Sequence, residues 1–487
     1  MQEEDFQNIN LWSMGHTVMK GSLMTDNTEV REKRAVTVGV NTAASGASSD
    51  FEVSMKELSG LAEACGYEVV GESRQNLSRI ENSTYIGSGK LSELKLFMES
   101  VDAGSALFLN TLSPAQLSNL CTELDAEVLD KTGLILNIFG ERARSREAKM
   151  QVESAKLKYM LPRLSGLRKN LSRQGGTGGS MSNKGSGEKQ TELDRRHIEK
   201  RLSELRRALD SIDGERETQR RRRQREGIPL VALVGYTNAG KSTLMNKLLE
   251  TFPGDEIKGG DSEKLEARKV EAKDMLFATL DTTVRRIDPG NGKKFLLSDT
   301  VGFIHDLPHE LIKAFRSTLE EAKTADLILN VVDYSDENRD RQIRVTEETL
   351  KELGAADIPV IYVMNKADKA VDTDEFLREL SYESNENNGK APHNKVAGEL
   401  LPVTRGNRIY MSAKTGEGIR ELAEMISAKL FEDYMEVEFL IPYEKGGAEN
   451  ELRQKAIIDT VEYRKDGIYI KCSVGTRLLG RYREFVI

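Results

Sequence analysis

The sequence contains few cysteines and no long apolar run. Only Cys65, Cys121 and Cys472 occur among 487 residues, far apart and without metal-site spacing, which favours reduced thiols in a cytosolic protein over a disulfide framework. No apolar stretch approaches the roughly 18 residues that a membrane span needs. Residues 1–26 are acidic near the start and lack a sustained apolar segment, so they do not resemble a secretory signal. These absences predict a cytoplasmic protein without a membrane span.

The formal net charge of −8 conceals an uneven distribution. Between residues 141 and 226 there are 24 lysines and arginines against 13 aspartates and glutamates, while the rest of the chain is acidic. A basic middle segment on an acidic chain predicts one surface directed at a polyanion such as nucleic acid. The hydrophobic content of 38% and the charged content of 31% are typical of a globular protein, and the length predicts about three domains.

Alternating strand and helix patterns predict a multi-domain α/β protein. Heptad-like apolar spacing from Met150 to Leu171, and again from Ile198 to Ile212, predicts two amphipathic helices that pair as an antiparallel hairpin, with a kink at Pro162. The predicted parts are a tail at 1–34, an N-terminal α/β domain at 35–140, a basic helical hairpin with a glycine-rich tip at 141–226, a second α/β domain at 227–432, and a small α+β domain at 433–487.

Three segments are rich in glycine or polar residues. Residues 173–190, between the two hairpin helices, are either a flexible linker or a finger whose backbone and lysines enter a nucleic-acid groove, and the sequence leaves both open. Residues 381–407 are expected to be an irregular insertion. Gly87 to Lys90 is interpreted as a structural turn rather than a second phosphate site.

The most specific motif lies between Leu230 and Thr243. Five apolar residues predict a buried strand that breaks at Gly235 and is followed by a helix around Lys241. This is G-x-x-x-x-G-K-S/T in the strand–loop–helix context that a phosphate-binding loop requires. We expect its N–H groups and the helix N-terminus to hold phosphates, Lys241 to reach the β- and γ-phosphates, and Ser242 to bind Mg²⁺.

Two further segments are expected to contact the γ-phosphate and its metal. An apolar strand ends in D-x-x-G, where Asp299 would hold Mg²⁺ through water and the Gly302 N–H would meet the γ-phosphate. The switch threonine must lie between the phosphate loop and Asp299, and Thr279 is favoured over Thr282 and Thr283. The predicted catalytic residues are therefore Lys241, Thr279 and Gly302, and the predicted Mg²⁺ residues are Ser242, Thr279 and, through water, Asp299.

Two motifs near the end of this domain are expected to read the base. Asn365 to Asp368 follows an apolar strand, and the Asp368 carboxylate can accept two hydrogen bonds that guanine offers and adenine does not. Backbone N–H groups near Ala413 are placed for the guanine O6. Because the motifs follow strands in this order, they predict a guanine-nucleotide switch domain. The predicted nucleotide-binding residues are Gly235, Tyr236, Thr237, Asn238, Ala239, Gly240, Lys241, Ser242, Thr243, Phe277, Ala278, Thr279, Leu280, Asp281, Asp299, Thr300, Val301, Gly302, Asn365, Lys366, Ala367, Asp368, Ser412, Ala413 and Lys414.

With these motifs in place, the chain resembles the HflX family of translational GTPases over about residues 36–479. The resemblance implies an N-terminal domain with an α/β part and a helical hairpin, a Ras-like P-loop GTPase domain, and often a small C-terminal domain. It also implies binding to the large ribosomal subunit near the peptidyl-transferase centre and splitting of stalled ribosomes under stress. The matching segments begin at Tyr85 (YIGSGK), Leu112 (LSPAQ), Val128 (VLDKTGLIL), Arg142 (RARSRE), Leu161 (LPRL), Leu171 (LSRQGG), Gly235 (GYTNAGKS), Phe277 (FATLD) and Asp299 (DTVGF).

The expected function is GTP hydrolysis by a protein whose GTP-bound form docks on rRNA of the large ribosomal subunit, splits stalled or idle ribosomes, and is released by hydrolysis. Two alternatives stay open: a GTPase that acts on immature large subunits during assembly, and a nucleotide-regulated anti-association factor. We expect a monomer that binds GTP and GDP.

Several positions depart from the family or raise further expectations. Thr282 stands where the family usually has proline, residues 252–274 are longer and more charged, and Met181 to Lys184 replace a tip in which arginine and proline are more common. Phe303 occupies the place of the glutamine that orients water in Ras-like switches, so intrinsic hydrolysis is expected to be slow. Asn238 suggests a K⁺ ion between loop and phosphates, with the alternative that it only braces the loop.

Overall fold

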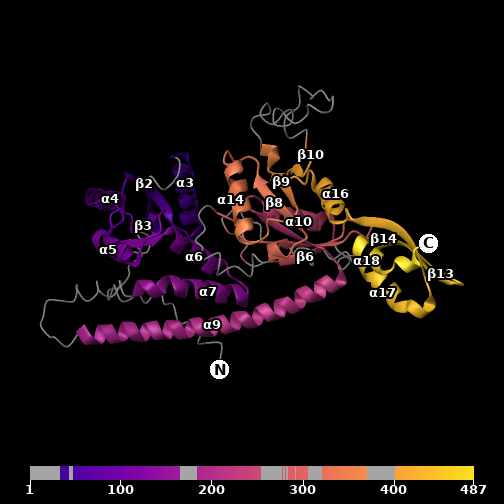
Figure 1. The fold of residues 1–487 in the computed structure, drawn as a ribbon. Helices are drawn as coiled ribbons and strands as arrows, with labels where there is room; N and C mark the ends of the chain where they lie inside the picture. Colours follow the sequence, from indigo (N-terminus) through magenta and orange to yellow (C-terminus); the bar gives the residue numbers. More distant parts are fainter. Residues whose placement is uncertain are drawn as a thin grey trace, which may run out of the picture. The chain divides into compact units, whose positions relative to one another are not determined.

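The computed structural model describes residues 33–42, 48–164, 184–253, 277, 280, 283–290, 292–304, 321–369 and 401–487. The chain divides into two compact units, with boundaries between Asn137 and Ile138, Leu161 and Pro162, and Leu193 and Asp194. Strands and helices alternate in both units (Figure 1), which confirms the predicted multi-domain α/β class. Among the described helices, none is long and apolar enough to cross a membrane.

The first unit contains a four-stranded parallel sheet in the order β2-β1-β3-β4. Strands β1, β3 and β4 carry β-branched or apolar runs, as is typical of strands, whereas β2 is longer and includes polar residues from Glu72 to Asn76. The α5 helix begins after a capping box in which Ser113 and Gln116 satisfy each other's backbone N–H groups. The elements are β1 (Arg34–Thr42), α3 (Ser48–Ala64), β2 (Glu68–Leu77), α4 (Ser88–Ser100), β3 (Ser105–Phe108), α5 (Pro114–Leu124), β4 (Glu127–Asp130) and α6 (Lys131–Arg142).

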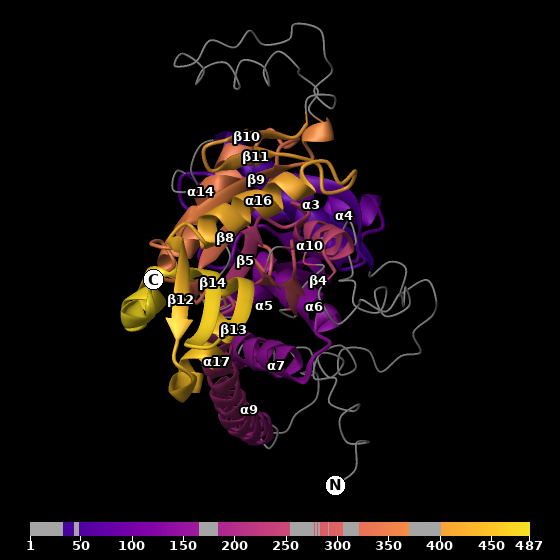
Figure 2. The same ribbon diagram turned by 90° about the vertical axis from the view of Figure 1, so that its right-hand side faces the viewer.

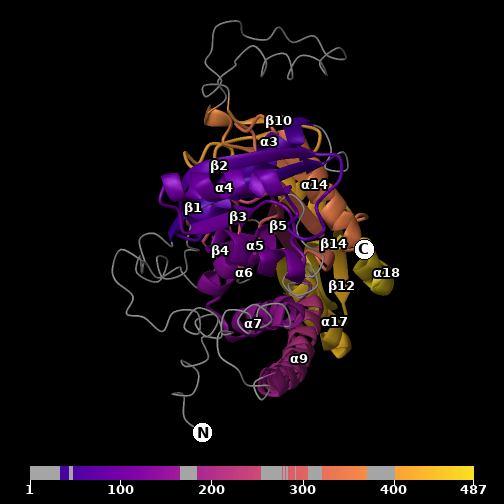
Figure 3. The same cartoon turned by 90° about the vertical axis from the view of Figure 1, so that its left-hand side faces the viewer.

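Helices cover both faces of this sheet (Figure 3). Alternate side chains of β1, β3 and β4 pack in opposite directions: Ala35, Leu107 and Leu129 lie in one cluster with α3, whereas Val36, Val38 and Phe108 lie in another with α4 and α5. Strands buried on both faces read as continuous apolar runs, which is what the sequence shows.

Two helices of the second unit form the predicted antiparallel pair. These are α7 (Arg146–Met160) and α9 (Lys184–Glu226) (Figure 1). Two ion pairs join them, Arg201–Glu153 (2.7 Å) and Arg216–Glu147 (2.9 Å). The later residue of α9 pairs with the earlier residue of α7, so the two helices are antiparallel. The α-helix is interrupted at the expected place: α7 ends at Met160, Pro162 lies in a 3₁₀ turn (Leu161–Arg163), and Leu164 is helical again, since proline cannot donate the next helical hydrogen bond.

The hairpin tip is shorter than the sequence suggested. An irregular segment was expected through residue 190, but α9 already begins at Lys184. Glu188, Lys189 and Gln190 are good helix formers, and extending an existing helix is far easier than nucleating one. The remainder of the tip, residues 173–183, lies outside the described part of the chain.

The second unit also contains a seven-stranded sheet in the order β10-β11-β9-β8-β5-β7-β6. Its five central strands are parallel, while the edge strands β6 and β10 are antiparallel to their neighbours. Neither edge strand was predicted, and β10 falls inside the segment expected to be an irregular insertion. The elements are β5 (Leu230–Gly235), α10 (Lys241–Thr251), β6 (Thr283–Ile287), β7 (Phe295–Asp299), β8 (Leu327–Asp333), α14 (Arg339–Glu352), β9 (Val360–Asn365), β10 (Val403–Arg405), β11 (Arg408–Tyr410) and α16 (Ile419–Leu430).

Helices α10 and α16 pack on one face of this sheet and α14 packs on the other. The central strands are therefore buried on both sides, and the loops that leave the carboxyl ends of β5, β7, β9 and β11 meet at one edge. The four nucleotide motifs occupy these loops.

The C-terminal part is a three-stranded antiparallel sheet, β12-β14-β13, with α17 against it (Figure 2). Inward-facing Phe439, Ile470 and Val474 form its core together with Leu452 of α17. This agrees with the predicted small α+β segment. The elements are β12 (Tyr434–Ile441), α17 (Gly446–Lys455), β13 (Ile457–Arg464), β14 (Gly467–Gly475) and α18 (Thr476–Arg481).

Candidate nucleotide-binding site

The phosphate loop connects the buried strand β5 to α10. Gly235 (φ +141°) and Gly240 (φ +96°) have backbone angles that side chains rarely permit. A Cβ on Gly235 would collide with the carbonyl oxygen of Val331, and one on Gly240 would collide with the Asn365 amide. Asn238 is also left-handed (φ +61°). Only glycine fits at positions 235 and 240, because the loop backbone turns there in close contact with Val331 and Asn365.

Lys241 lies under this loop with 7% of its surface exposed. Its Nζ donates to the carbonyl oxygens of Gly235 (3.0 Å) and Tyr236 (2.8 Å). Burial lowers the pKa of Lys241 to about 8, and nearby Asp299 partly opposes that shift. The ammonium therefore sits against the loop backbone, held by groups that a phosphate oxygen can replace.

Ser242 and Asp299 bring two oxygen groups together. The Ser242 hydroxyl donates to Asp299 Oδ2 over 2.8 Å, and the Asp299 side chain is fully buried. A Cβ on Gly302 would lie 2.9 Å from the Thr237 Cα and 3.0 Å from Lys241 Nζ, which puts the Gly302 backbone directly against the loop. The structure thus brings together the predicted residues of the first and second motifs.

Phe303 joins the phosphate loop to the D-x-x-G segment. Its carbonyl accepts from the Thr237 N–H (2.8 Å) and its N–H donates to the Gly235 carbonyl (3.1 Å). The side chain is 2% exposed and packs in the core with Val234 and Ala322. Phe303 therefore brings no polar group of its side chain to the site.

The base-reading loops are tied to the phosphate loop by Asn365. Its Nδ2 donates to the Ala239 carbonyl (2.8 Å) and its Oδ1 accepts from the Ala413 N–H (2.8 Å). The Ala413 N–H, one of the groups considered for guanine O6, is thus used within the protein. Asn365 acts as a bridge between three motifs, a role that its position in N-K-x-D alone did not reveal.

Buried oxygens at the site include Asp368 Oδ1 and Thr237 Oγ1, which make no hydrogen bond within the described part of the chain. Buried oxygens usually have a partner, because leaving one unpaired costs about 1–3 kcal/mol. A carboxylate oxygen at Asp368 is the acceptor that guanine's N–H donors need. The site is therefore chemically incomplete by itself and fits a guanine nucleotide.

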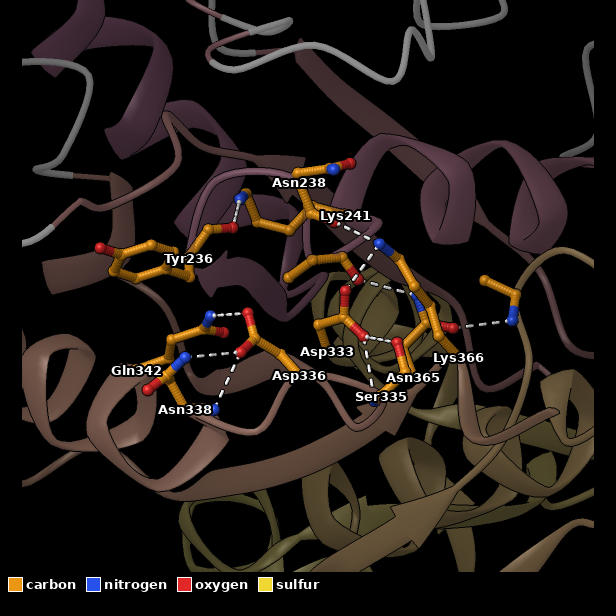
Figure 4. A network of polar contacts seen from close by, with 12 residues as sticks. Tyr236, Asn238, Lys241, Asp333, Ser335, Asp336, Asn338, Gln342, Asn365 and Lys366 are labelled. Carbon is orange, nitrogen blue, oxygen red and sulfur yellow. Dashed lines mark hydrogen bonds and ion pairs between the residues drawn. The ribbon is translucent and has the colours of Figure 1, made fainter. Parts of the chain in front are cut away.

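The sequence did not predict the part played by Asp333. This residue ends β8, and its Oδ2 forms an ion pair with Lys366 Nζ over 2.8 Å (Figure 4). The same Nζ donates to the Asn238 carbonyl over 2.8 Å. The sequence offered one indication of this role, namely an acidic residue at the carboxyl end of another apolar strand.

Some predicted residues lie outside the described part of the chain: Ala278, Thr279, Asp281 and the alternative Thr282. Their neighbours Phe277 and Leu280 are each 2% exposed. The switch threonine therefore stays a prediction.

Comparison with known proteins agrees with this geometry. Residues 52–140 match the family model of the GTP-binding GTPase N-terminal region, 142–223 match the GTP-binding GTPase middle region, and 230–366 match the 50S ribosome-binding GTPase family. GTPase HflX of Caldanaerobacter subterraneus is 39% identical over 90% of this chain and 92% of its own length. GTPase HflX of Escherichia coli is 34% identical over 85% and 87%.

Among solved structures, a GTP-binding protein of Sulfolobus solfataricus in complex with GDP matches 82% of this chain and 99% of its own, with 24% identity and a TM-score of 0.40. The two sequence relatives match 85–90% of this chain and 87–92% of their own length. The chain belongs to the HflX family of GTPases.

Proposed function

We propose that this site binds GTP with Mg²⁺ and that its GTP-bound form acts on the large ribosomal subunit. The unpaired, buried Asp368 Oδ1 carries the nucleotide part of the proposal, because it needs a donor that guanine supplies. The Ser242 hydroxyl and the Asp299 carboxylate support Mg²⁺, since that ion takes oxygen ligands and few of them from the protein.

In this proposal Ser242 and Thr279 hold the metal directly and Asp299 holds it through water. The ion would neutralise charge on the phosphates. Lys241 exchanges its two carbonyl acceptors for phosphate oxygens, and Gly302 offers its N–H to the γ-phosphate. Phe303 supplies no group to orient water, so slow intrinsic hydrolysis and activation by a partner are expected.

The ribosomal part rests on charge and on family membership. The α7–α9 pair lies in the most basic part of the sequence, and the sequence that connects the two helices is rich in glycine. The GTPase domain matches a family described as 50S ribosome-binding. Both support docking on rRNA of the large subunit, and we propose the splitting of stalled or idle ribosomes because the resemblance to the HflX family implies it.

Sucrose-gradient profiles of intact ribosomes test this function. With GTP, the protein should convert intact ribosomes into free subunits. Splitting that also occurs with a non-hydrolysable analogue would make binding the working event, as in an anti-association factor. Association with immature large subunits alone would replace the splitting function with an assembly function.

We also propose K⁺ as a second cation at the phosphate loop. Asn238 is exposed, and within the described chain its side chain makes no hydrogen bond, while its backbone carbonyl accepts from Lys366 Nζ. Its amide oxygen is free to contribute to a cation between loop and phosphates.

A further inference from the structure

Asp333 holds its carboxylate in a fixed position beside the phosphate loop. One oxygen, Oδ1, accepts from the Ser335 N–H (3.1 Å) and the Ser335 hydroxyl (2.6 Å). The other oxygen, Oδ2, faces Lys366 Nζ at 2.8 Å (Figure 4). Ser335 therefore fixes one oxygen of the carboxylate, and among the described residues the other oxygen contacts only the lysine.

Lys366 and Asn238 both have left-handed backbones at φ +61°. Residues other than glycine adopt this conformation rarely, and it persists where surrounding contacts enforce it. The two residues are in direct contact, since the Lys366 ammonium donates to the Asn238 carbonyl over 2.8 Å. The apex of the phosphate loop and the base-reading loop are thus joined through one ammonium group.

The ion pair between Lys366 and Asp333 is mostly buried but borders on solvent. The Lys366 and Asp333 side chains are 20% and 18% exposed, so a lysine without the carboxylate could turn toward solvent and release the Asn238 carbonyl. Asn365 makes a parallel link to the Ala239 carbonyl, but it does not reach Asn238. The Asp333 carboxylate therefore holds the Lys366 side chain in its inward position.

We propose that Asp333 is a positioning residue for guanine recognition: by fixing Lys366 against Asn238, it couples the base-reading loop to the phosphate loop. Asp333 lies outside the four nucleotide motifs and acts through Lys366 rather than on the nucleotide. The inference rests on the proposed assignment of Asn365–Asp368 as the base-reading loop.

The test is a titration of GDP and IDP against Asp333→Asn. The variant keeps the size of the side chain but removes the charge that holds Lys366. GDP affinity should fall about three- to tenfold, as expected for one half-buried charged contact. IDP lacks the 2-amino group of guanine, so it depends less on the alignment of the base-reading loop and should lose less affinity. The ratio of GDP to IDP affinity should therefore fall.

The matched control is Asp336→Asn. Asp336 lies on the same loop and accepts from the Asn338 N–H (2.8 Å) and Gln342 Nε2 (2.7 Å). In Figure 4 its carboxylate is bonded to Asn338 and Gln342 and not to Lys366. GDP affinity in this variant should stay within about twofold. Equal losses in both variants would overturn the proposal.

A double-mutant cycle separates positioning from a general structural role. In a Lys366→Met background, Asp333→Asn should cause no further loss, because its effect passes through the ammonium. Additive losses, or equal losses of GDP and IDP, would overturn the proposal. If Asp333→Asn does not fold, Ser335→Ala, which frees the carboxylate without removing its charge, should give about a twofold fall in the same ratio. An unchanged ratio there would overturn it as well.

Measuring Asp368→Asn alongside distinguishes a failure of the positioning role from a failure of the base-reading assignment. If that variant loses GDP affinity while Asp333→Asn does not, only the positioning role fails. If Asp368→Asn keeps full GDP affinity, the base-reading assignment fails and the positioning role falls with it.

Discussion

Phe139 and Phe277 meet edge to face, with ring centroids 4.8 Å apart and an interplanar angle of 80°. Phe139 lies near the end of α6 and is 1% exposed, and Phe277 is 2% exposed with a left-handed backbone at φ +55°. A bulky residue adopts that conformation only when its surroundings hold it. The Phe139 ring is one such holding contact, at the first residue of the F-A-T-L-D segment.

Phe139→Leu is expected to lower the free energy of unfolding by about 1–2 kcal/mol, since the variant loses an aromatic contact and some core volume. It should also slow GTP hydrolysis without changing GDP affinity, because Phe277 begins the proposed switch segment. Thermal unfolding and single-turnover hydrolysis measure the two effects. Phe431→Leu is the control, since Phe431 makes a similar contact with Tyr434 (4.9 Å, 87°) at the end of α16. Equal slowing in both variants would contradict the expectation.

Asp368→Asn is expected to weaken GTP binding by about 2–4 kcal/mol and to favour xanthine nucleotides. The asparagine amide would present a donor to guanine's own donors, whereas xanthine offers an oxygen there. Competition between GTP and XTP on the purified protein measures the change. Asp357→Asn, an exposed carboxylate before β9, serves as control. Unchanged preference for GTP would remove Asp368 from the base site.

The lowered pKa of Lys241, about 8, predicts a pH effect on nucleotide binding. Below that pH the ammonium is charged and buried, which destabilises the fold. Between pH 8 and the ordinary value of 10.5 the unfolded chain holds more protons, so this contribution to stability rises with pH. A bound phosphate favours the charged form, so GDP binding above pH 8 should take up a proton and weaken as pH rises.

Calorimetric titration of GDP in two buffers of different ionisation heat measures this uptake. Above pH 8 the observed heat should depend on the buffer, and the dependence should vanish in Lys241→Met. A heat of binding that is independent of the buffer at pH 9 would contradict the coupling.

Deleting Gly175–Asn183 is expected to abolish ribosome-stimulated hydrolysis while sparing GTP binding. The deletion stops before Lys184 because α9 begins there. Ribosome binding by the intact protein should weaken steeply with salt, by nearly one unit of log–log slope for each phosphate contact. Pelleting assays across salt concentrations measure it. Full stimulation of the deletion variant, or a flat salt response, would favour the linker interpretation of the tip.

Hydrolysis is expected to be faster in K⁺ than in Na⁺ at equal ionic strength, because a K⁺ ion at Asn238 would offset charge developing between the β- and γ-phosphates. Asn238→Ala should remove the difference and leave the rate in Na⁺ unchanged. Equal rates of the original protein in both salts, with and without ribosomes, would place the activating group on the ribosome.

The sequence predicts most of the fold here because its strands are short apolar runs and its motifs have fixed positions on them. Gly235, Lys241 and Asp299 could be placed from spacing alone. The edge strands β6 and β10 could not, since Val403–Arg405 has only three residues and one apolar side chain to mark it. The start of α9 was missed because glycines at 185 and 187 indicate a turn, while the helix that follows extends back through them.

Contacts between distant residues were beyond prediction for a different reason. Asp333 and Lys366 are 33 positions apart, and nothing in the local pattern of either indicates the other. They meet because β8 and β9 are paired with Asp333 beside Asn365. The same holds for Phe139 and Phe277, whose meeting depends on how α6 packs.

The α9 helix has 43 residues without a break, so it is about 65 Å long. Only residues 227–229 separate it from β5, the strand that carries the phosphate loop, and a Cβ on Gly227 would lie 3.0 Å from the Lys455 side chain. So short a connection restricts how far α9 can move independently of β5. A rod of this length that pivots by about 10° at one end carries its other end through roughly 11 Å. A change near the phosphates that turned α9 by this angle would therefore move its far end by more than the width of a helix backbone.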